Sequence, residues 1–526
     1  MKLFKKILLF ILIVFAYYYF ALPPINLHSI EFWIFLIITY VLFVILFLDL
    51  KLIFNYKNRM FKDITKKSSI IVGIPVVIIL LILLVNIIVS PVFNSKSYSK
   101  RITIDTSKTF QEDIKEVDFT HVPLLDRDST EKIGDRVVGE MTDLVSQFYV
   151  SNLYTQINYN DKIVRVTPLE YNGIIKYFAN RKKGIDGYVM VDSVTGEAKL
   201  VRLDKGMKYI PSAYFNEKTE RILRFKYPTY IFGEYYFEID NDGNPYFIYP
   251  VITYTGVEVK EEIKGIVIFN PINKDSKYYS VKDVPTWVDH VYSSSLILEQ
   301  VDDWGLYGGG FINSIFGEKN VVATTTGYNY MVQDDDVYLY TGITSVSSDE
   351  SNLGFILSNL RTKETNYYLV SGAEEYSAMS SAEGEVQERR YTSTFPLLIN
   401  LNGRPTYLVS LKDNAGLVKM YGFVDVQDYQ KVSVTDASLG IFKAKDNYLK
   451  ILGNKEPNSE NTITIKSIKE VIIDSNTYYY IEDTEGNRYR VSIKVNEDLL
   501  PYIKVNETYK ISFNNDVNIK EITYIE

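Results

Sequence analysis

Histidine, serine and cysteine are the usual sources of a catalytic base or nucleophile, and this sequence has three histidines and no cysteine. His28 and His121 lie in a predicted loop and a predicted tether, whereas His290 follows Asp289 and precedes Ser293 to Ser295. On a helix, adjacent side chains point about 100° apart, so Asp289 cannot orient the His290 imidazole as a catalytic triad requires. We interpret this segment as a capped amphipathic helix. The absence of cysteine excludes disulfides, thiolate metal sites and thiol nucleophiles.

A second pattern matches the start of a calcium-binding loop, with acidic side chains at Glu238, Asp240 and Asp242 before Gly243. The twelfth position of that loop is Tyr249, where calcium loops carry a bidentate glutamate. Asp242-Gly243 is also a typical two-residue hairpin turn. We therefore predict a turn here and no metal site.

Four acidic residues accompany a helix that we predict over residues 377–390: Glu374, Glu375, Glu383 and Glu385. Carboxylates can be paired for glycoside hydrolysis, but on a solvent-facing helix they are ordinary solvated charges. Ser97 and Lys100 have the Ser-x-x-Lys spacing of some acyl-transfer enzymes, within a segment that has no other pattern. Gly308 to Gly310 lack the Lys-Ser/Thr of a phosphate-binding loop. The sequence thus predicts a chain that is not an enzyme and has no catalytic, metal or cofactor site.

Three apolar stretches predict membrane-spanning helices, over residues 7–22, 32–48 and 70–93. A helix needs about 20 apolar residues to cross the hydrocarbon core, and within 70–93 the only polar side chains are Asn86 and Ser90. The first stretch resembles a signal peptide, but Tyr17 to Phe20 occupy the place where cleavage requires small residues. We predict an uncleaved anchor of three spans.

Positive charge predicts the orientation of this anchor. Lys2, Lys5 and Lys6 precede the first span, and the loop 49–68 contains six further cations, so both belong in the cytoplasm. Residues 94–526 are then extracytoplasmic. Residues 1–95 carry a net charge of +6 and the remainder −14, which argues against nucleic acid as a partner. The three spans contain no ionisable residue, so the sequence provides no ion pathway.

The exterior region alternates predicted helices and antiparallel hairpins. A polar tether over 94–127 contains one possible strand at 101–105, and predicted helices then begin at residues 129, 168, 212, 286 and 377. The second of these is predicted from Thr167-Pro168, because proline is favoured at the first helical position. The uneven spacing excludes a solenoid and favours diverged α+β units packed side by side.

Three hairpin texts, GYVMVDSVTGEAKLV, YYFEIDNDGNPYFIY and LLINLNGRPTYLV, resemble hairpins of PepSY-type modules. The resemblance covers residues 165–280 and 377–426. It implies small non-catalytic modules outside the membrane, of a kind proposed to hold peptidases or other envelope proteins. The insert at 305–375 departs from the compact size of that family.

The C-terminal residues have a different predicted pattern, in which strands follow one another after a linker. A predicted helix over 436–452 and a linker over 454–461 precede strands at 462–473, 477–482, 488–495, 508–513 and 517–525, with a helical turn at Leu499-Leu500. This β-β-β-α-β-β order resembles a five-stranded OB-like barrel. Residues 460–526 contain eight Lys/Arg and twelve Asp/Glu, so a structural or protein-binding role is favoured over nucleic-acid binding.

The predicted fold is a membrane-anchored α+β chain. We divide it into a three-span anchor (1–93), a tether (94–127), PepSY-like α+β units (128–282), a helix with an antiparallel β-rich region and a PepSY-like end (283–435), a helix and linker (436–459), and an OB-like barrel (460–526).

The predicted function is that of a non-catalytic extracytoplasmic scaffold or binding protein of the cell envelope. Its expected partners are the lipid bilayer and a protein, such as an envelope enzyme or peptidase that it holds or regulates. Aromatic residues that follow the predicted helix 286–303 are the expected contact, because such residues are enriched at hot spots: Trp304, Tyr307 and Phe311. Two alternatives remain open, an envelope hydrolase with dispersed carboxylates and an accessory subunit of a membrane complex.

Overall fold

The computed structural model describes residues 2–47, 66–139, 141, 144–333, 335–346, 351–452, 459–473, 476–513 and 519–524. The chain forms two compact parts, Met1–Tyr448 and Leu449–Glu526. Residues 48–65, which include most of the cation-rich loop 49–68, and residues 453–458, which include most of the predicted linker 454–461, lie outside the described residues, as do the side chains of 66–70 and 72.

The first part contains four modules with a shared order of elements: a helix, an edge strand split in two, a long central strand and two further antiparallel strands, with one additional helix after the central strand of module 1. Module 1 has α7 (Arg127–Gly139), β2 (Phe148–Val150), β3 (Thr155–Tyr159), β4 (Lys162–Tyr171), α8 (Ile174–Asn180), β5 (Ile185–Asp192) and β6 (Ala198–Met207). Module 2 has η2 (Phe215–Glu217), α9 (Thr219–Lys226), β7 (Ile231–Phe232), β8 (Tyr236–Ile239), β9 (Pro245–Thr255), β10 (Lys260–Phe269) and β11 (Ser276–Ser280).

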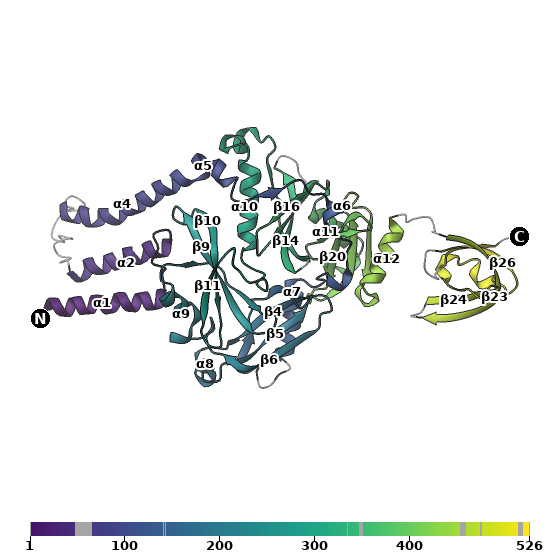
Figure 1. Ribbon diagram of the computed structural model, residues 1–526, viewed down its shortest axis with the longest axis horizontal. Coiled ribbons are helices and arrows are strands. Elements are labelled where there is room, and N and C mark those ends of the chain that lie inside the picture. The colour runs from purple at the N-terminus through teal and green to yellow at the C-terminus, as the bar shows by residue number, and fades with distance from the viewer. Residues whose placement is uncertain are drawn as a thin grey trace. The chain divides into compact units, whose positions relative to one another are not determined.

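Module 3 has α10 (Ser294–Tyr307), η3 (Asn313–Gly317), β12 (Val322–Thr324), β13 (Asn329–Gln333), β14 (Asp336–Ser345), β15 (Ser351–Asn359) and β16 (Thr365–Tyr368). A short strand β17 (Gly372–Ala373) also pairs with β15. Module 4 has α11 (Glu375–Gly384), η4 (Gln387–Arg389), β18 (Thr392–Ser393), β19 (Leu397–Leu401), β20 (Arg404–Lys412), β21 (Val418–Asp425) and β22 (Val432–Asp436). The body is therefore a mixed α/β structure with several sheets (Figure 1).

One hydrogen bond recurs at the same place in each module. Where the edge strand is interrupted, the carbonyl of the central strand accepts a bond from the chain that links the two halves. These bonds run from the N–H of Ser151 to Pro168, of Gly233 to Pro250, of Thr325 to Gly342 and of Thr394 to Ser410, at 2.8–3.0 Å. The modules are thus four copies of one plan, despite their different lengths.

The interruption explains why the helix predicted from Pro168 is wrong. Pro168 lies inside β4 and is paired with Tyr188 of β5. The Pro168 carbonyl points toward the interrupted edge strand, and in a strand the N–H of a residue points to the same side as its carbonyl. The N–H that proline lacks would therefore face the interruption, where no strand residue needs it as a donor. The nearest helix, α8, begins at Ile174.

The turn after β5, β10, β15 and β21 also repeats. An Asp or Asn side chain accepts hydrogen bonds from the N–H groups two and three residues later, as in an Asx turn. The four residues are Asp192, Asn270, Asn359 and Asp425. Of the three hairpin texts, the first spans this turn, whereas the other two span the earlier turns β8–β9 and β19–β20.

Neighbouring modules share hydrophobic cores. Modules 1 and 2 meet around buried aromatic rings such as Tyr188 and Phe237. Helix α10 lies between the sheets of modules 2 and 3 and buries Ile297 there (Figure 1). Modules 3 and 4 meet at Phe355 and Tyr407.

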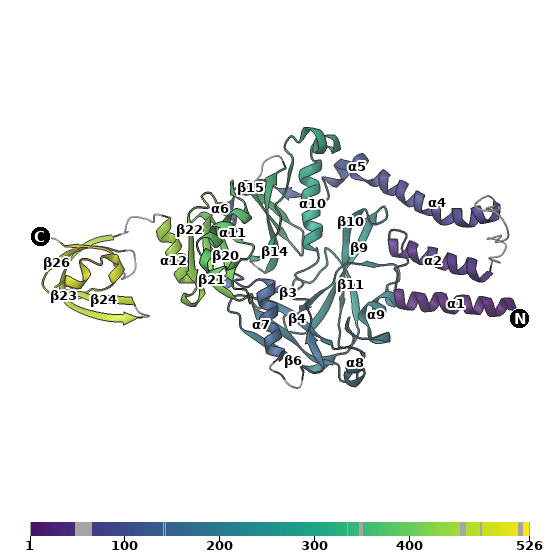
Figure 2. The ribbon, with the colours of Figure 1, turned by 180° about the vertical axis from the view of Figure 1, so that it is seen from behind.

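Two helices are long and apolar enough to cross a membrane, α1 (Lys2–Ala21) and α2 (Ile30–Phe47). Within α4 (Lys66–Val89), residues 73–89 meet the same criterion only together with α5 (Pro91–Tyr98), and the two are bent by 47°. Pro91 at the start of α5 accounts for this break, since proline cannot continue the hydrogen bonds of α4. All three apolar segments lie side by side and project from one side of the body (Figures 1 and 2).

The turn between β9 and β10 docks on these helices. The Glu258 carboxylate accepts from the N–H of Ile30 at 2.8 Å and so caps α2, while the His28 ring contacts the Gly256 carbonyl at 2.6 Å. Gly256 has φ +81°, and a Cβ there would lie 2.8 Å from Val89 of α4. Glycine is therefore required at this contact.

Residues 94–127, predicted as a tether, run along the body. β1 (Ile104–Asp105) pairs in parallel with β16, and α6 (Phe110–Asp113) and η1 (Phe119–His121) follow. The buried Arg101 guanidinium contacts Glu299 and Asp303 of α10 at 2.5 Å. Phe110 and Phe119 are also buried, so this segment contributes to the core.

The second part is built on one antiparallel sheet in the order β25-β24-β23-β26-β27. Its elements are β23 (Ser459–Ile473), β24 (Asn476–Asp483), β25 (Arg488–Ser492), η6 (Ile493–Val495), η7 (Leu500–Tyr502), β26 (Thr508–Phe513) and β27 (Ile519–Tyr524). β23 pairs with β26 through its first half and with β24 through its second half. Closure of this sheet into an OB-like barrel stays a prediction. η5 (Ala437–Leu439) and α12 (Ile441–Ile451) precede it.

Candidate functional site

A cavity of about 620 Å³, which we name the junction pocket, opens where α1 meets modules 1 and 2. Phe20 of α1 lines it together with residues of β4, η2 and α9. Its polar side chains are mainly tyrosines and glutamates: Tyr149, Glu170, Tyr171, Tyr214, Glu220 and Tyr235. A concave site with a few converging polar groups is the usual form of a ligand pocket.

Cross-strand pairing positions Glu170 in the junction pocket. Glu170 on β4 lies opposite Tyr149 on β2. Its carboxylate accepts hydrogen bonds from the hydroxyls of Tyr149 and Ser151, both at 2.5 Å. Each oxygen of Glu170 therefore accepts one hydrogen bond from the protein.

Glu220, in the first turn of α9, is held differently. Its side chain is 34% exposed, yet Oε2 is buried and has no hydrogen-bond partner among the described residues. The Lys218 ammonium is 3.9 Å from this oxygen, beyond hydrogen-bond distance. Burial raises the pKa of Glu220, and the charge of Glu170 raises it further.

The hydroxyl of Tyr171 is a second buried polar atom in this wall. The residue is 3% exposed, and its hydroxyl has no hydrogen-bond partner among the described residues. Burial raises the pKa of Tyr171, so this group is a neutral hydroxyl at physiological pH. Buried polar atoms are nearly always paired, so Glu220 and Tyr171 together mark the wall that a ligand would complete.

Two arginines of α9 hold the end of α1 beside the pocket. Arg221 Nε donates to the Tyr19 carbonyl at 3.1 Å, and the guanidinium lies 4.1 Å from the centre of the Tyr19 ring. Arg224 Nε donates to the Leu22 carbonyl at 2.9 Å. These contacts flank Phe20, so the wall that α1 supplies is fixed by α9.

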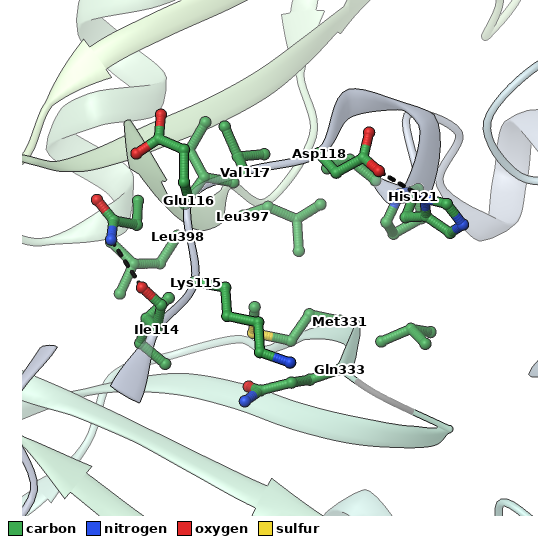
Figure 3. A pocket seen from close by; sticks show the side chains of 15 residues that line it. Ile114, Lys115, Glu116, Val117, Asp118, His121, Met331, Gln333, Leu397 and Leu398 are labelled. Atoms are coloured by element: carbon green, nitrogen blue, oxygen red, sulfur yellow. Dashed lines mark hydrogen bonds and ion pairs between the residues drawn. The ribbon is translucent and has the colours of Figure 1, made fainter. Parts of the chain in front are cut away.

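A second pocket, of about 190 Å³, lies where modules 3 and 4 meet segment 114–118 (Figure 3). We name it the edge-strand groove, because β13 and β19 are edge strands and contribute Met331 and Leu397 to it. The segment is fixed to β19 by bonds of Asn400, whose carbonyl accepts from Val117 N–H at 2.9 Å and whose Nδ2 donates to the Ile114 carbonyl at 2.7 Å. In Figure 3, Lys115 extends across the pocket toward Gln333. Nine of the fifteen residues that line the groove are apolar, and the others are Lys115, Glu116, Asp118, His121, Gln333 and Asn400.

His290 is not on a helix, because α10 begins at Ser294 with Ser293 as its cap. The helix predicted from residue 286 therefore starts too early. His290 is buried, and its Nδ1 is 3.2 Å from Glu238 Oε1. Glu238 also accepts from the main-chain N–H of Asp289 and His290. Glu238, which the sequence suggested only as part of a turn, is thus the carboxylate that orients this histidine.

Asp289 faces another way from His290. Its carboxylate accepts from the Asn158 N–H at 2.8 Å, and burial together with the charge of Glu238 raises its pKa well above the ordinary value. The His290 ring stacks on Tyr236 at 4.8 Å. Among the described residues, no serine hydroxyl is hydrogen-bonded to His290. Ser293 Oγ lies 3.1 Å from Ser295 Oγ instead. This enclosed cluster joins modules 1, 2 and 3.

The remaining candidates of the sequence also have structural partners. Asp240 caps its own turn by accepting from the N–H of Asp242 and Asn244. Ser97 Oγ lies 2.7 Å from Lys260 Nζ, which replaces Lys100 as its cationic neighbour. Among the described residues no group of three or more His, Cys, Asp or Glu side chains is placed to hold a metal ion.

The expectation of a solvent-facing acidic helix is wrong for one of its four carboxylates. Glu375 is fully buried at the start of α11, and it accepts from the Tyr340 hydroxyl at 3.0 Å. Burial raises its pKa. Strand β17 ends at Ala373, two residues before Glu375, and pairs with β15 of module 3. The first turn of α11 therefore begins in the core that modules 3 and 4 share.

The three predicted contact residues are partly buried. Trp304 lies against Tyr367, with ring centres 6.2 Å apart, and Tyr307 lies between Tyr98 and Phe311 at 6.1 and 6.5 Å. The exposed apolar side chains follow them, with Ile312 74% and Phe316 84% exposed. A contact role for Trp304, Tyr307 and Phe311 stays a prediction.

The junction pocket was missed by sequence reasoning. Its residues come from α1, β2, β4 and α9, which are separated by up to about two hundred positions, and no spacing rule connects them. No spacing signal pointed to it either, since Arg221 and Arg224 each follow a glutamate by four positions, Glu217 and Glu220, and so match ordinary helical ion pairs.

Comparison with known proteins identifies no family. No family model and no curated protein matches the chain. Among solved structures, a chimera of apocarotenoid oxygenase and RPE65 aligns with 8% identity over 53% of this chain and 48% of that chain, with a TM-score of 0.14. A Synechocystis apocarotenoid oxygenase mutant aligns with 7% identity over 54% and 49%, also with a TM-score of 0.14. This chain spans about half the length of those it matches, and at these scores the likeness bears on neither fold nor function.

Proposed function

We propose that this chain is a non-catalytic, membrane-anchored binding protein that holds a protein partner outside the cytoplasm. α1 and α2 are two spans of the anchor, and α4 with α5 forms the third. An odd number of spans places the body opposite the N-terminus, and Lys2, Lys5 and Lys6 favour a cytoplasmic N-terminus. The hydrogen bonds of the β9–β10 turn then hold the body close to the membrane surface.

The observation that carries the binding role is the edge-strand groove. An edge strand presents main-chain N–H and C=O groups that a further strand can pair with. The groove combines the edge strand β13 with apolar side chains, of which Met331 and Val332 are partly exposed. Addition of a peptide strand uses these two features, main-chain bonds for affinity and apolar pockets for side chains.

The partner that fits this groove is an extended apolar segment of another protein. Segment 114–118 supports this, because it already crosses the same groove as an extended chain bonded to Asn400 of β19. The cavity of about 190 Å³ beside Met331 and Val332 of β13 is where the side chains of such a segment would enter.

A photo-crosslinking amino acid at Gln333 in the full-length chain tests this proposal in membranes. We expect a crosslinked protein that disappears when Met331→Lys places a charge in the groove. Leu369→Lys is the matched control, since Leu369 is 74% exposed and does not line the groove. A crosslink that persists with Met331→Lys, or none at all, would contradict the groove as a binding site.

A second candidate function is that of an envelope hydrolase, and the junction pocket favours it. Glu170 and Glu220 line one pocket in different environments, and Glu220 has a raised pKa. A carboxyl group with a raised pKa can act as a general acid, while a second carboxylate in the same pocket acts as base or nucleophile.

Hydrolysis of cell-wall glycan by the purified full-length chain tests this second function. If the chain is a glycosidase, Glu170→Gln and Glu220→Gln should each lower the rate by at least about a hundredfold. Glu234→Gln, an exposed carboxylate outside the pocket, is the control and should leave the rate unchanged. Absence of hydrolysis by the wild-type chain would favour the binding role.

A further inference from the structure

We propose that the junction pocket binds the ammonium group of a membrane lipid headgroup. This inference rests on the membrane anchor of the proposed function but not on the edge-strand groove. Three properties of the pocket support it: the chemistry of its wall, its unpaired buried atoms, and the apolar side chains at its mouth.

The wall of the pocket combines tyrosine side chains with carboxylates. Four tyrosines line it, Tyr149, Tyr171, Tyr214 and Tyr235. Aromatic rings attract cations through their faces, and tyrosine-lined sites are a known means of holding alkylammonium groups. Carboxylates add a full negative charge and accept hydrogen bonds from an ammonium.

The unpaired atoms show where such a group would lie. Arg221 is occupied by the Tyr19 and Phe215 carbonyls, and Glu170 by two hydroxyls. Glu220 Oε2 is left as a buried acceptor. An ammonium supplies up to three donors and no acceptor, so it satisfies this oxygen and can also donate to the Tyr171 hydroxyl.

Lys218 is the competing cation in the same wall. Its side chain is 39% exposed and lies 3.9 Å from Glu220 Oε2. Exposed ion pairs of this length contribute little to stability, so Lys218 can leave Glu220 without a large cost. It is then available to the phosphate that accompanies an ammonium in a zwitterionic lipid.

The mouth of the pocket favours a lipid over a soluble amine. Phe20, at the end of apolar helix α1, is 69% exposed, and Phe215 is 45% exposed. The exposed apolar surface continues from Phe215 to Phe178, 6.1 Å away, and to Ile175, which is 78% exposed on the same helix, α8. An apolar rim next to a membrane-spanning helix is suited to contact acyl chains while the pocket holds the headgroup.

Isothermal titration of the full-length chain in a non-ionic detergent tests the proposal. The probes are dihexanoyl phosphatidylethanolamine, dihexanoyl phosphatidylglycerol, which lacks the ammonium, and free ethanolamine. We expect phosphatidylethanolamine to bind at least about tenfold more tightly than phosphatidylglycerol, as loss of a hydrogen-bonded charge pair implies. Glu220→Gln should weaken that binding by a similar factor and Tyr171→Phe by a smaller one.

Two controls identify the site and the source of the ammonium. Glu234→Gln removes an exposed charge beside Tyr235 but outside the pocket, and should leave the affinity unchanged. The double variant Ile175→Ser, Phe178→Ser should weaken the binding of phosphatidylethanolamine and leave the binding of ethanolamine unchanged. Equal binding of the two lipids, or wild-type affinity in Glu220→Gln, would overturn the proposal, and ethanolamine binding as tightly as the lipid would overturn the lipid source. None of these results depends on Met331 or on a protein partner, so a failure here is separate from a failure at the groove.

Discussion

The side-chain amide of Asn86 pairs with both main-chain polar groups of Val257: Oδ1 accepts from the Val257 N–H at 2.9 Å and Nδ2 donates to the Val257 carbonyl at 3.1 Å. Asn86 is one of two polar side chains in the apolar stretch 70–93. The pair joins α4 to the turn between β9 and β10, which also caps α2 through Glu258. One turn of module 2 therefore connects two apolar helices to the body.

Replacing Asn86 by leucine should loosen this junction. Asn86→Leu leaves two main-chain groups of Val257 without their partner, at an expected cost of about 1–3 kcal/mol. The measurement is hydrogen exchange of the Val257 amide in detergent, together with the melting temperature of the full-length chain. Ser90→Ala is the control, because Ser90 Oγ donates to the Ile87 carbonyl of the adjoining α4 and does not reach the β9–β10 turn among the described contacts. Unchanged exchange at Val257 would show that the pair does not hold the junction.

The orientation of the body can be measured by cysteine labelling, because the natural chain has no cysteine. Lys205→Cys places a thiol on an exposed position of β6. Asn58→Cys places one in the cation-rich loop. A membrane-impermeant maleimide added to intact cells should label the first and spare the second, which reacts only after lysis. Labelling of Asn58→Cys in intact cells would reverse the predicted topology.

The pKa of Glu220 predicts a pH dependence of stability. A carboxyl group whose pKa is raised by folding binds its proton more tightly in the folded chain, so its contribution to stability falls as pH rises above its ordinary value of 4.5. Glu220→Gln removes this loss, and the variant should melt at a higher temperature than the wild type at pH 7.5. The difference should shrink as pH approaches 4. Thermal melts of both proteins across this range provide the measurement, and a constant difference would contradict the assignment.

Hydrophobic periodicity and turn residues predicted several helices and hairpins. A local sequence pattern could not show which strands pair with each other in the folded sheet. Pro168 has the spacing of a helix start, yet it lies in a strand because the neighbouring edge strand is interrupted beside it. That interruption is a property of the whole sheet. The Asx turns are different, since Asp192 and its equivalents act on residues two and three positions later, and such signals are visible in sequence.

The buried charges show the same limit. His290 is oriented by Glu238, 52 positions earlier, and Glu375 bonds Tyr340, 35 positions earlier. Both pairs form only after modules pack together. The junction pocket depends on α1 and α9 being adjacent, through Tyr19 and Arg221, 202 positions apart. Sites of this kind require the tertiary structure.

The aromatic segment after α10 gives a test of the predicted contact residues. Trp304→Ala removes a ring packed on Tyr367 and should cost about 3 kcal/mol of stability, as other large aromatic truncations do. Phe316→Ala removes a side chain that is 84% exposed and should leave the melting temperature unchanged. If this segment binds a partner, Phe316→Ala should nevertheless reduce recovery of the partner that is crosslinked at Gln333. If Phe316→Ala recovers as much partner as the wild-type chain, the segment is not part of the binding surface.

The part Leu449–Glu526 should fold without the rest of the chain. Its strands β23 to β27 enclose a core of their own, in which Ile465, Ile481 and Ile511 are at most 1% exposed. A small domain with its own core can fold alone, although its stability is modest at this size. A fragment that begins at residue 453 should therefore show a β-type circular dichroism spectrum and one cooperative melt. Ile511→Ala should lower the stability by about 2–5 kcal/mol, whereas Tyr502→Ala, at a side chain that is 74% exposed, should have little effect. If the fragment has no cooperative melt, or if both substitutions act equally, the core is incomplete without residues of the first part.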